Sequence, residues 1–197
     1  MSEFFLPFLT LAVATAFTPG PNNIMMTASG ANFGYWRSFP HILGVSFGFP
    51  AMFLALAFGL GEVFQRWPVI HEVLRYLGAA FLLYMAWRIA TAGRARVRER
   101  GRPLTFIEAS AFQWINPKGV LVAISMIATF TVDVPDFYHR VLMMAAITLA
   151  TAFGSINTWC IFGMAIGRLL RTDQHLRMFN ITMALLLTGS IVYLFLS

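Results

Sequence analysis

Two short stretches of the sequence place prolines and amides inside long apolar runs. "TPGPNN" covers residues 18–23, and "INPKG" covers residues 115–119. A proline has no N–H and disrupts the helical hydrogen bond to the carbonyl four residues earlier, so each stretch predicts a helix break. Such a break exposes carbonyl groups on one half-helix and N–H groups on the next. Because helix N-termini bind anions and free carbonyls attract ammonium groups, these stretches suit a zwitterion.

The residues expected to bind a substrate lie mostly in and beside these stretches. Lys118 is the one charged residue expected deep in a membrane, where burying a charge costs about 3 kcal/mol or more. It would attract a substrate carboxylate, although a lysine that only binds backbone carbonyls and fixes its helix is the alternative. The expected substrate-binding set is Pro19, Gly20, Pro21, Asn22, Asn23, Gln113, Asn116, Pro117, Lys118, Asn157 and Asn180. Asn157 and Asn180 could instead simply bridge helices, as intramembrane amides often do.

The sequence lacks the groups that other kinds of site require. No Asp or Glu is expected at mid-depth, because Glu108 falls near the start of its apolar segment. A substrate with a neutral side chain is therefore favoured over a cationic one. No cluster of His, Asp and Glu is expected at depth either, which argues against an enzyme, a metal site or a cofactor. Cys160 is the single cysteine, so no intrachain disulfide can form, and His41 is expected at the cytoplasmic end of its segment.

The composition is typical of an integral membrane protein. The 197 residues are 58% hydrophobic and 11% charged, with a mean hydropathy of +0.71, whereas soluble domains are about 25% charged. The net charge is +6, but aromatic and basic residues are not interleaved, so nucleic-acid binding is not expected. The first apolar stretch follows Met-Ser-Glu, without a positive charge, and is expected to be an uncleaved helix rather than a signal peptide.

The predicted fold is all-α, a single transmembrane domain over residues 1–197. Six segments reach the length of about 20 apolar residues that a bilayer core requires: 4–30, 38–61, 68–90, 104–131, 137–168 and 176–196. The proline breaks fall near the middle of the first and fourth segments. Each of these segments opens a group of three, and three spans reverse the direction of the chain. We therefore expect two inverted repeats, 1–92 and 104–197, joined by a basic loop, 93–103. Prolines that only kink helices for packing are the alternative.

The arginines predict an orientation. Three connections that would lie on one side carry Arg37, Arg88, Arg94, Arg96, Arg98, Arg100, Arg102, Arg168, Arg171 and Arg177, whereas the other side carries Arg66, Arg75 and Arg140. Positive residues favour the cytoplasmic side, so loop 93–103 is expected there and both termini outside. Contact with anionic lipid headgroups accounts for the charge of the loop, which makes membrane lipid an expected partner.

These motifs resemble the LysE/RhtB family of amino-acid exporters. "TPGPNN", the following "ANFGYWRSFPHILGVSFGF" and "INPKG" carry the resemblance, which runs the whole length and is strongest with the cysteine/O-acetylserine exporter branch. The resemblance implies a secondary exporter of small neutral amino acids or derivatives, of the cysteine/O-acetylserine or homoserine/threonine type, in a bacterial inner membrane.

The resemblance also bears on the energy source and leaves alternatives open. It implies export driven by the proton gradient. Many relatives carry an acid where this chain has Asn22, which removes one candidate proton carrier. A passive channel or a lipid-handling protein that uses the same breaks is the alternative function, and assembly as a homo-oligomer is left open.

Overall fold

The computed structural model describes residues 2–60, 68–92, 101–131, 135–170 and 172–196. The secondary structure of these residues is entirely helical, which confirms the predicted all-α class. The helices are α1 (Ser2–Phe17), α2 (Pro21–Phe33), α3 (Tyr35–Ala55), the π-helical turn η1 (Leu56–Leu60), α5 (Pro68–Ala90), α7 (Phe106–Ile115), α8 (Pro117–Phe130), α9 (Phe137–Leu169) and α10 (Asp173–Leu196). Arg66, Arg94, Arg96, Arg98, Arg100 and Arg171 lie outside the described residues.

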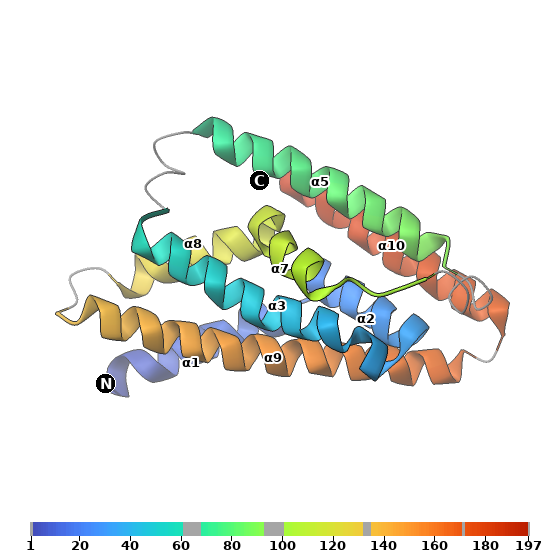
Figure 1. The fold of residues 1–197 in the computed structure, drawn as a ribbon, viewed down its shortest axis with the longest axis horizontal. Helices are drawn as coiled ribbons and strands as arrows, with labels where there is room; N and C mark the ends of the chain where they lie inside the picture. Colours follow the sequence, from blue (N-terminus) through green and yellow to red (C-terminus); the bar gives the residue numbers. More distant parts are fainter. Residues whose placement is uncertain (1, 61–67, 93–100, 132–134, 171, 197) are drawn as a thin grey trace.

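The helices form an elongated bundle (Figure 1). The long helix α9 packs against α2, α3 and α1, and α3 also packs against α7. Helices α5 and α10 lie side by side along one flank of the bundle. Gly34 alone separates α2 from α3, and its φ of 77° lies in the left-handed region that glycine adopts readily. Because of this one-residue turn, α2 and α3 extend beyond the expected bounds of 30 and 38.

Both predicted helix breaks are confirmed. Helix α1 ends at Phe17 and α2 begins at Pro21, with a bend of 54° between them. Helix α7 ends at Ile115 and α8 begins at Pro117, where the intervening Asn116 has an extended backbone. By contrast, α3 runs continuously through Pro50, whose immediate neighbours are Phe49 and Ala51.

The apolar core consists of two clusters that divide at the level of the breaks. One cluster joins α2, α3, α5, α7, α9 and α10 around Met26, Ile42, Leu82 and Phe112. The other joins α1, α3, α8 and α9 around Phe8, Phe53, Ala123 and Met144. The half-helices α1 and α8 therefore belong to one cluster, whereas α2 and α7 belong to the other.

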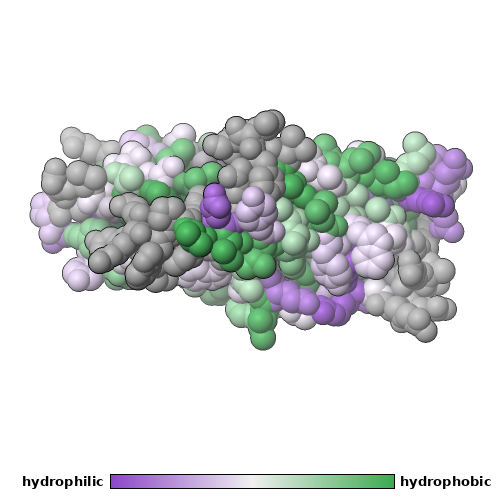
Figure 2. Space-filling view, turned by 90° about the horizontal axis from the view of Figure 1, so that it is seen from above, coloured by the Kyte–Doolittle hydropathy of each residue, from purple (hydrophilic) through white to green (hydrophobic). Residues whose placement is uncertain are grey.

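The exterior suits a lipid environment. Figure 2 shows hydrophobic residues over much of the visible face and a group of hydrophilic residues at one end. Large apolar side chains stand exposed, including Ile107 at 76% and Leu169 at 78%. Among the described residues, Tyr35–Gly59 and Phe137–Leu169 are long and apolar enough to cross a membrane, and Phe4–Phe17 with Pro21–Phe33 makes a third span if the bent pair is counted as one. The expected layout of six spans in two inverted repeats stays a prediction, because the described residues contain only these two or three spans by length and composition.

Candidate functional site

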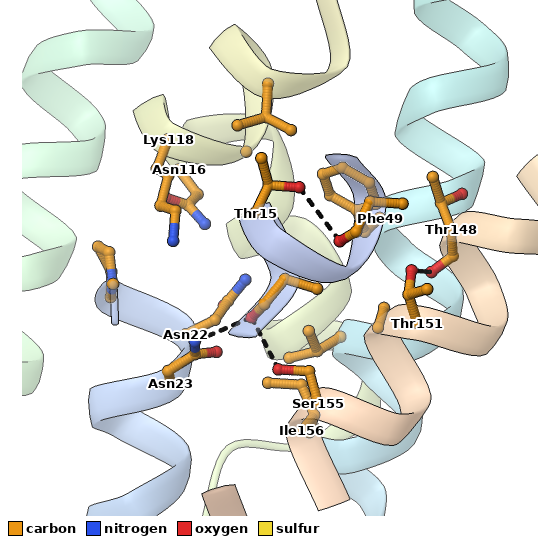
Figure 3. A pocket seen from close by; sticks show the side chains of 18 of the residues that line it. Thr15, Asn22, Asn23, Phe49, Asn116, Lys118, Thr148, Thr151, Ser155 and Ile156 are labelled. Carbon is orange, nitrogen blue, oxygen red and sulfur yellow. Dashed lines mark hydrogen bonds between the residues drawn. The ribbon is translucent and has the colours of Figure 1, made fainter. Parts of the chain in front are cut away.

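A pocket lies between the two helix breaks. Its volume is about 80 Å³, and it is partly open to the surroundings. Its lining includes Val45 and Ile156 from one apolar cluster and Ala12 and Met126 from the other. The pocket therefore lies where the two clusters meet. Its polar lining residues are Thr15, Asn22, Asn23, Asn116, Lys118, Thr148, Thr151 and Ser155 (Figure 3).

Lys118 reaches from the first turn of α8 to the end of α1. Its Nζ donates a hydrogen bond to the carbonyl oxygen of Thr18 at 2.6 Å and lies 3.5 Å from that of Pro19. The carboxyl end of a helix carries partial negative charge, so the ammonium group is well placed there. Gly20 makes room for this side chain, because a Cβ on Gly20 would lie 2.8 Å from Lys118 Cδ. The lysine therefore joins the two breaks.

Amide side chains reinforce the same junction. Asn22 and Gln113 exchange two hydrogen bonds of 2.8 and 3.3 Å, which link the start of α2 to the end of α7. Asn23 donates to the carbonyls of Ala16 and Thr18 at 3.0 and 2.9 Å, and Ser155 of α9 donates to that of Ala16 at 2.7 Å. Carbonyls that the end of a helix leaves without backbone partners are thus satisfied by side chains.

Two helix N-termini face the pocket. The first intrahelical hydrogen bonds are donated by Ile24 in α2 and by Val120 in α8. The preceding N–H groups have no carbonyl within their own helix to bind, and they belong to Asn22, Asn23, Lys118 and Gly119, which all line the pocket. The partial positive charge of both N-termini favours an anion between them.

The pocket also contains an unused acceptor. Asn116, the residue between α7 and α8, is 3% exposed, and its Oδ1 has no hydrogen-bond partner among the described residues. A buried amide oxygen that accepts no hydrogen bond destabilises the folded protein, because it has given up its hydrogen bonds to water. A donor group that reaches this atom would therefore be stabilised there.

The structure brings together most of the predicted binding residues. Gly20, Pro21, Asn22, Asn23, Asn116 and Lys118 line the pocket. Gln113 hydrogen-bonds to the lining residue Asn22, and Pro19 and Pro117 lie at the two helix breaks. The other two predicted residues lie elsewhere and join helices. Asn157 accepts a hydrogen bond from Tyr35 at 2.7 Å, and Asn180 pairs with Asn32 at 2.8 and 3.0 Å.

The sequence reasoning missed the contribution of α9. Thr148, Thr151 and Ser155 line the pocket beside the apolar Ala152 and Ile156. Their separations of three and four residues place the three hydroxyls on one face of a helix. The polar face of α9 could therefore have been predicted from the spacing of these hydroxyl residues within a long apolar segment.

Half-helices that meet around a polar pocket inside an apolar bundle are typical of membrane transporters. The family model described as LysE type translocator matches residues 13–197. The chain is 32% identical over 192 residues to the cysteine/O-acetylserine efflux protein of Salmonella typhimurium, covering 95% of each chain. It is 30% identical over 192 residues to the protein of the same name from Escherichia coli K12, again over 95% of each. No solved structure matches the chain significantly.

The chain therefore belongs to the LysE type translocator family. Membership of this family makes the protein a transporter and not an enzyme, as the sequence predicted.

Proposed function

We propose that the protein is a secondary exporter of small neutral amino acids or their derivatives, driven by the proton gradient across a bacterial inner membrane. The names of its relatives favour cysteine and O-acetylserine as substrates. Homoserine and threonine are small neutral amino acids of similar chemistry. One observation carries the proposal. Both half-helix N-termini and the ammonium group of Lys118 belong to the lining of a single pocket.

The substrate carboxylate binds between the two N-termini. The N–H groups of Asn22, Asn23 and Gly119 supply donors, and Lys118 supplies a full positive charge. Without substrate, the Lys118 ammonium binds the carbonyl of Thr18 at 2.6 Å. A carboxylate that enters the pocket offers this ammonium a stronger, oppositely charged partner, so the lysine turns toward it.

The rest of the substrate meets neutral groups. The α-ammonium donates to Asn116 Oδ1, the buried acceptor without a partner, and to hydroxyl oxygens of α9. Among the described residues that line the pocket, none is acidic. A cationic substrate side chain would therefore find no counter-charge, whereas Phe49, Val122 and Met126 offer an apolar wall to a small neutral one.

The two breaks also support the proposed pair of inverted repeats. Helices α2 and α8 both begin with proline after an extended residue, Gly20 or Asn116, and both N-termini line the pocket. Six spans arranged in this way place the binding site at the repeat interface, where the halves rock against each other during transport.

A variant at Lys118 tests the proposed site. Lys118→Ala removes the positive charge, and losing a hydrogen bond to a charged group costs about 1.5–3 kcal/mol, or roughly a tenfold to hundredfold loss of efflux. Efflux of radiolabelled O-acetylserine from loaded proteoliposomes measures this loss. Arg168→Ala is the matched control, because it removes an exposed cation from the last turn of α9. Undiminished efflux by Lys118→Ala contradicts the assignment.

The driving force separates an exporter from a passive channel. In inside-out vesicles, an imposed proton gradient should drive substrate accumulation above the external concentration, and an uncoupler should abolish it. A channel would only equilibrate the substrate, with or without the uncoupler.

A further inference from the structure

His41 forms a second buried polar site, separate from the pocket. The sequence predicted a position near the cytoplasmic end of its segment, and in the structure the side chain is 0% exposed and is enclosed between helices. Its Nδ1 lies 3.2 Å from the hydroxyl oxygen of Ser29 on α2. Its Nε2 is buried and has no hydrogen-bond partner among the described residues. A titratable ring with one free nitrogen thus lies inside the bundle, on the α2 side of the breaks.

Ser29 of α2, the hydrogen-bond partner of the ring, is uncharged. Glu108, in the first turn of α7, is a carboxylate whose charge acts on His41, and α7 packs against α3. The backbones approach closely there, since a Cβ on Gly44 would lie 2.6 Å from that of Ala109.

Glu108 is already paired in this conformation. Its carboxylate accepts two hydrogen bonds from Arg102, at 2.6 and 2.7 Å, and one from the Thr105 N–H at 2.8 Å. The chain around Arg102 is tied to two other helices, because Arg88 donates to the Arg102 carbonyl at 2.8 Å and Arg37 to that of Gly101 at 2.9 Å. The arginine thereby largely neutralises this carboxylate.

These contacts make His41 a poor proton acceptor in the conformation described. In either tautomer, a neutral imidazole has one nitrogen whose lone pair can accept a proton. A buried imidazolium requires water or a counter-charge, and no carboxylate among the described residues hydrogen-bonds to Nε2. A conformation in which Arg102 leaves Glu108, or in which water reaches Nε2, binds the proton more tightly. A ligand shifts a conformational equilibrium when its affinity differs between the states.

We propose that His41 is the proton-binding site that couples the proton gradient to transport. This inference rests on the proposed export function. The proton binds the ring nitrogen that carries no hydrogen when the start of α7 separates from Arg102, and it leaves when the contacts described here form again. Proton binding therefore favours one conformation of the bundle, while the substrate binds at the helix breaks.

The experiment compares two activities of the purified protein in liposomes. Exchange of labelled for unlabelled O-acetylserine needs only the substrate site, whereas accumulation driven by an imposed pH gradient also needs the proton site. His41→Gln retains a polar side chain but cannot titrate. We expect this variant to exchange substrate near the wild-type rate and to lose both gradient-driven accumulation and the accompanying proton flux. His175→Gln, at an exposed position on α10, should retain all three.

The possible results test the coupling role of His41 and the proposed export function separately. Accumulation by His41→Gln at the wild-type level overturns the coupling role. Loss of exchange in both His41→Gln and the smaller His41→Asn also overturns it, since the residue would then be structural. Ser29→Ala keeps the titratable ring, and it should retain accumulation with an altered pH dependence. If the wild-type protein neither exchanges nor accumulates the substrate, the proposed function fails, independently of His41.

Discussion

At Gly20, the absence of a side chain determines where Lys118 can lie. The backbone of Gly20 is extended, with φ of −171°, a conformation open to any residue. The backbone conformation at position 20 therefore does not require glycine. A Cβ there would lie 2.8 Å from Lys118 Cδ and 3.1 Å from Nζ, so the lysine could not keep its present course.

Gly20→Ala should therefore impair transport without unfolding the protein. The flexible lysine can move aside, but its ammonium group is then displaced from the place where the substrate carboxylate is proposed to bind, which weakens a charged hydrogen bond of about 1.5–3 kcal/mol. We expect roughly a tenfold loss of efflux, while the protein still unfolds cooperatively in detergent. The control is Gly189→Ala in α10, where an added Cβ meets nothing within 4 Å. A normal efflux rate in Gly20→Ala would show that the position of the lysine does not matter.

Single residues differed in how well the sequence revealed them. Lys118 and the amides beside the prolines were predictable, because burying a charge or an amide without a partner is unfavourable and points to a site. Asn157 and Asn180 have the same chemistry but pair with Tyr35 and Asn32. Such pairing depends on residues far away in the chain, so composition and spacing could not reveal it.

At the scale of helices, the contact between α2 and α9 depends on glycine. A Cβ on Gly163 would overlap the backbone of Thr27, and one on Gly167 would lie 2.7 Å from the carbonyl oxygen of Ala31. Small residues let transmembrane helices approach closely and gain van der Waals contact. Backbone atoms cannot move aside as a lysine side chain can, so these positions tolerate no enlargement.

Gly163→Ala should destabilise the bundle by about 1–3 kcal/mol, the usual effect of overpacking a close contact. Gly154→Ala on the same helix is the matched control, since an added Cβ meets nothing within 4 Å there. Alanine is favoured over glycine in a helix by up to about 1 kcal/mol, so this control should be neutral or stabilising. Thermal unfolding in detergent micelles measures both. Equal melting temperatures would contradict the close α2–α9 contact.

The positions of the helix breaks could be predicted from the local sequence, whereas the pairs of helices that pack together could not. Proline and its neighbours determine where a helix must end, whatever surrounds it. The packing of α2 on α9 and of α5 on α10 joins residues more than eighty positions apart. Uniformly apolar segments carry little information about which face meets which neighbour, so the pattern of contacts required the structure.

For the whole molecule, the distribution of arginines predicts both termini outside and loop 93–103 in the cytoplasm. Fusion of alkaline phosphatase after residue 197 should therefore give an active periplasmic enzyme, and fusion of green fluorescent protein there should give no fluorescence. The same reporters placed after Ala92, at the end of α5, should behave in the opposite way. Matching behaviour at the two sites would contradict an odd number of spans between them.

The division of the core into two apolar clusters has a mechanical consequence. Apolar side chains pack together on both sides of the breaks, around Phe8 and around Leu82, and the pocket lies between these two clusters. We therefore expect the bundle to bend first at this level. A substrate bound at the proposed site would lie at this hinge, where a small tilt of one end against the other changes its surroundings the most.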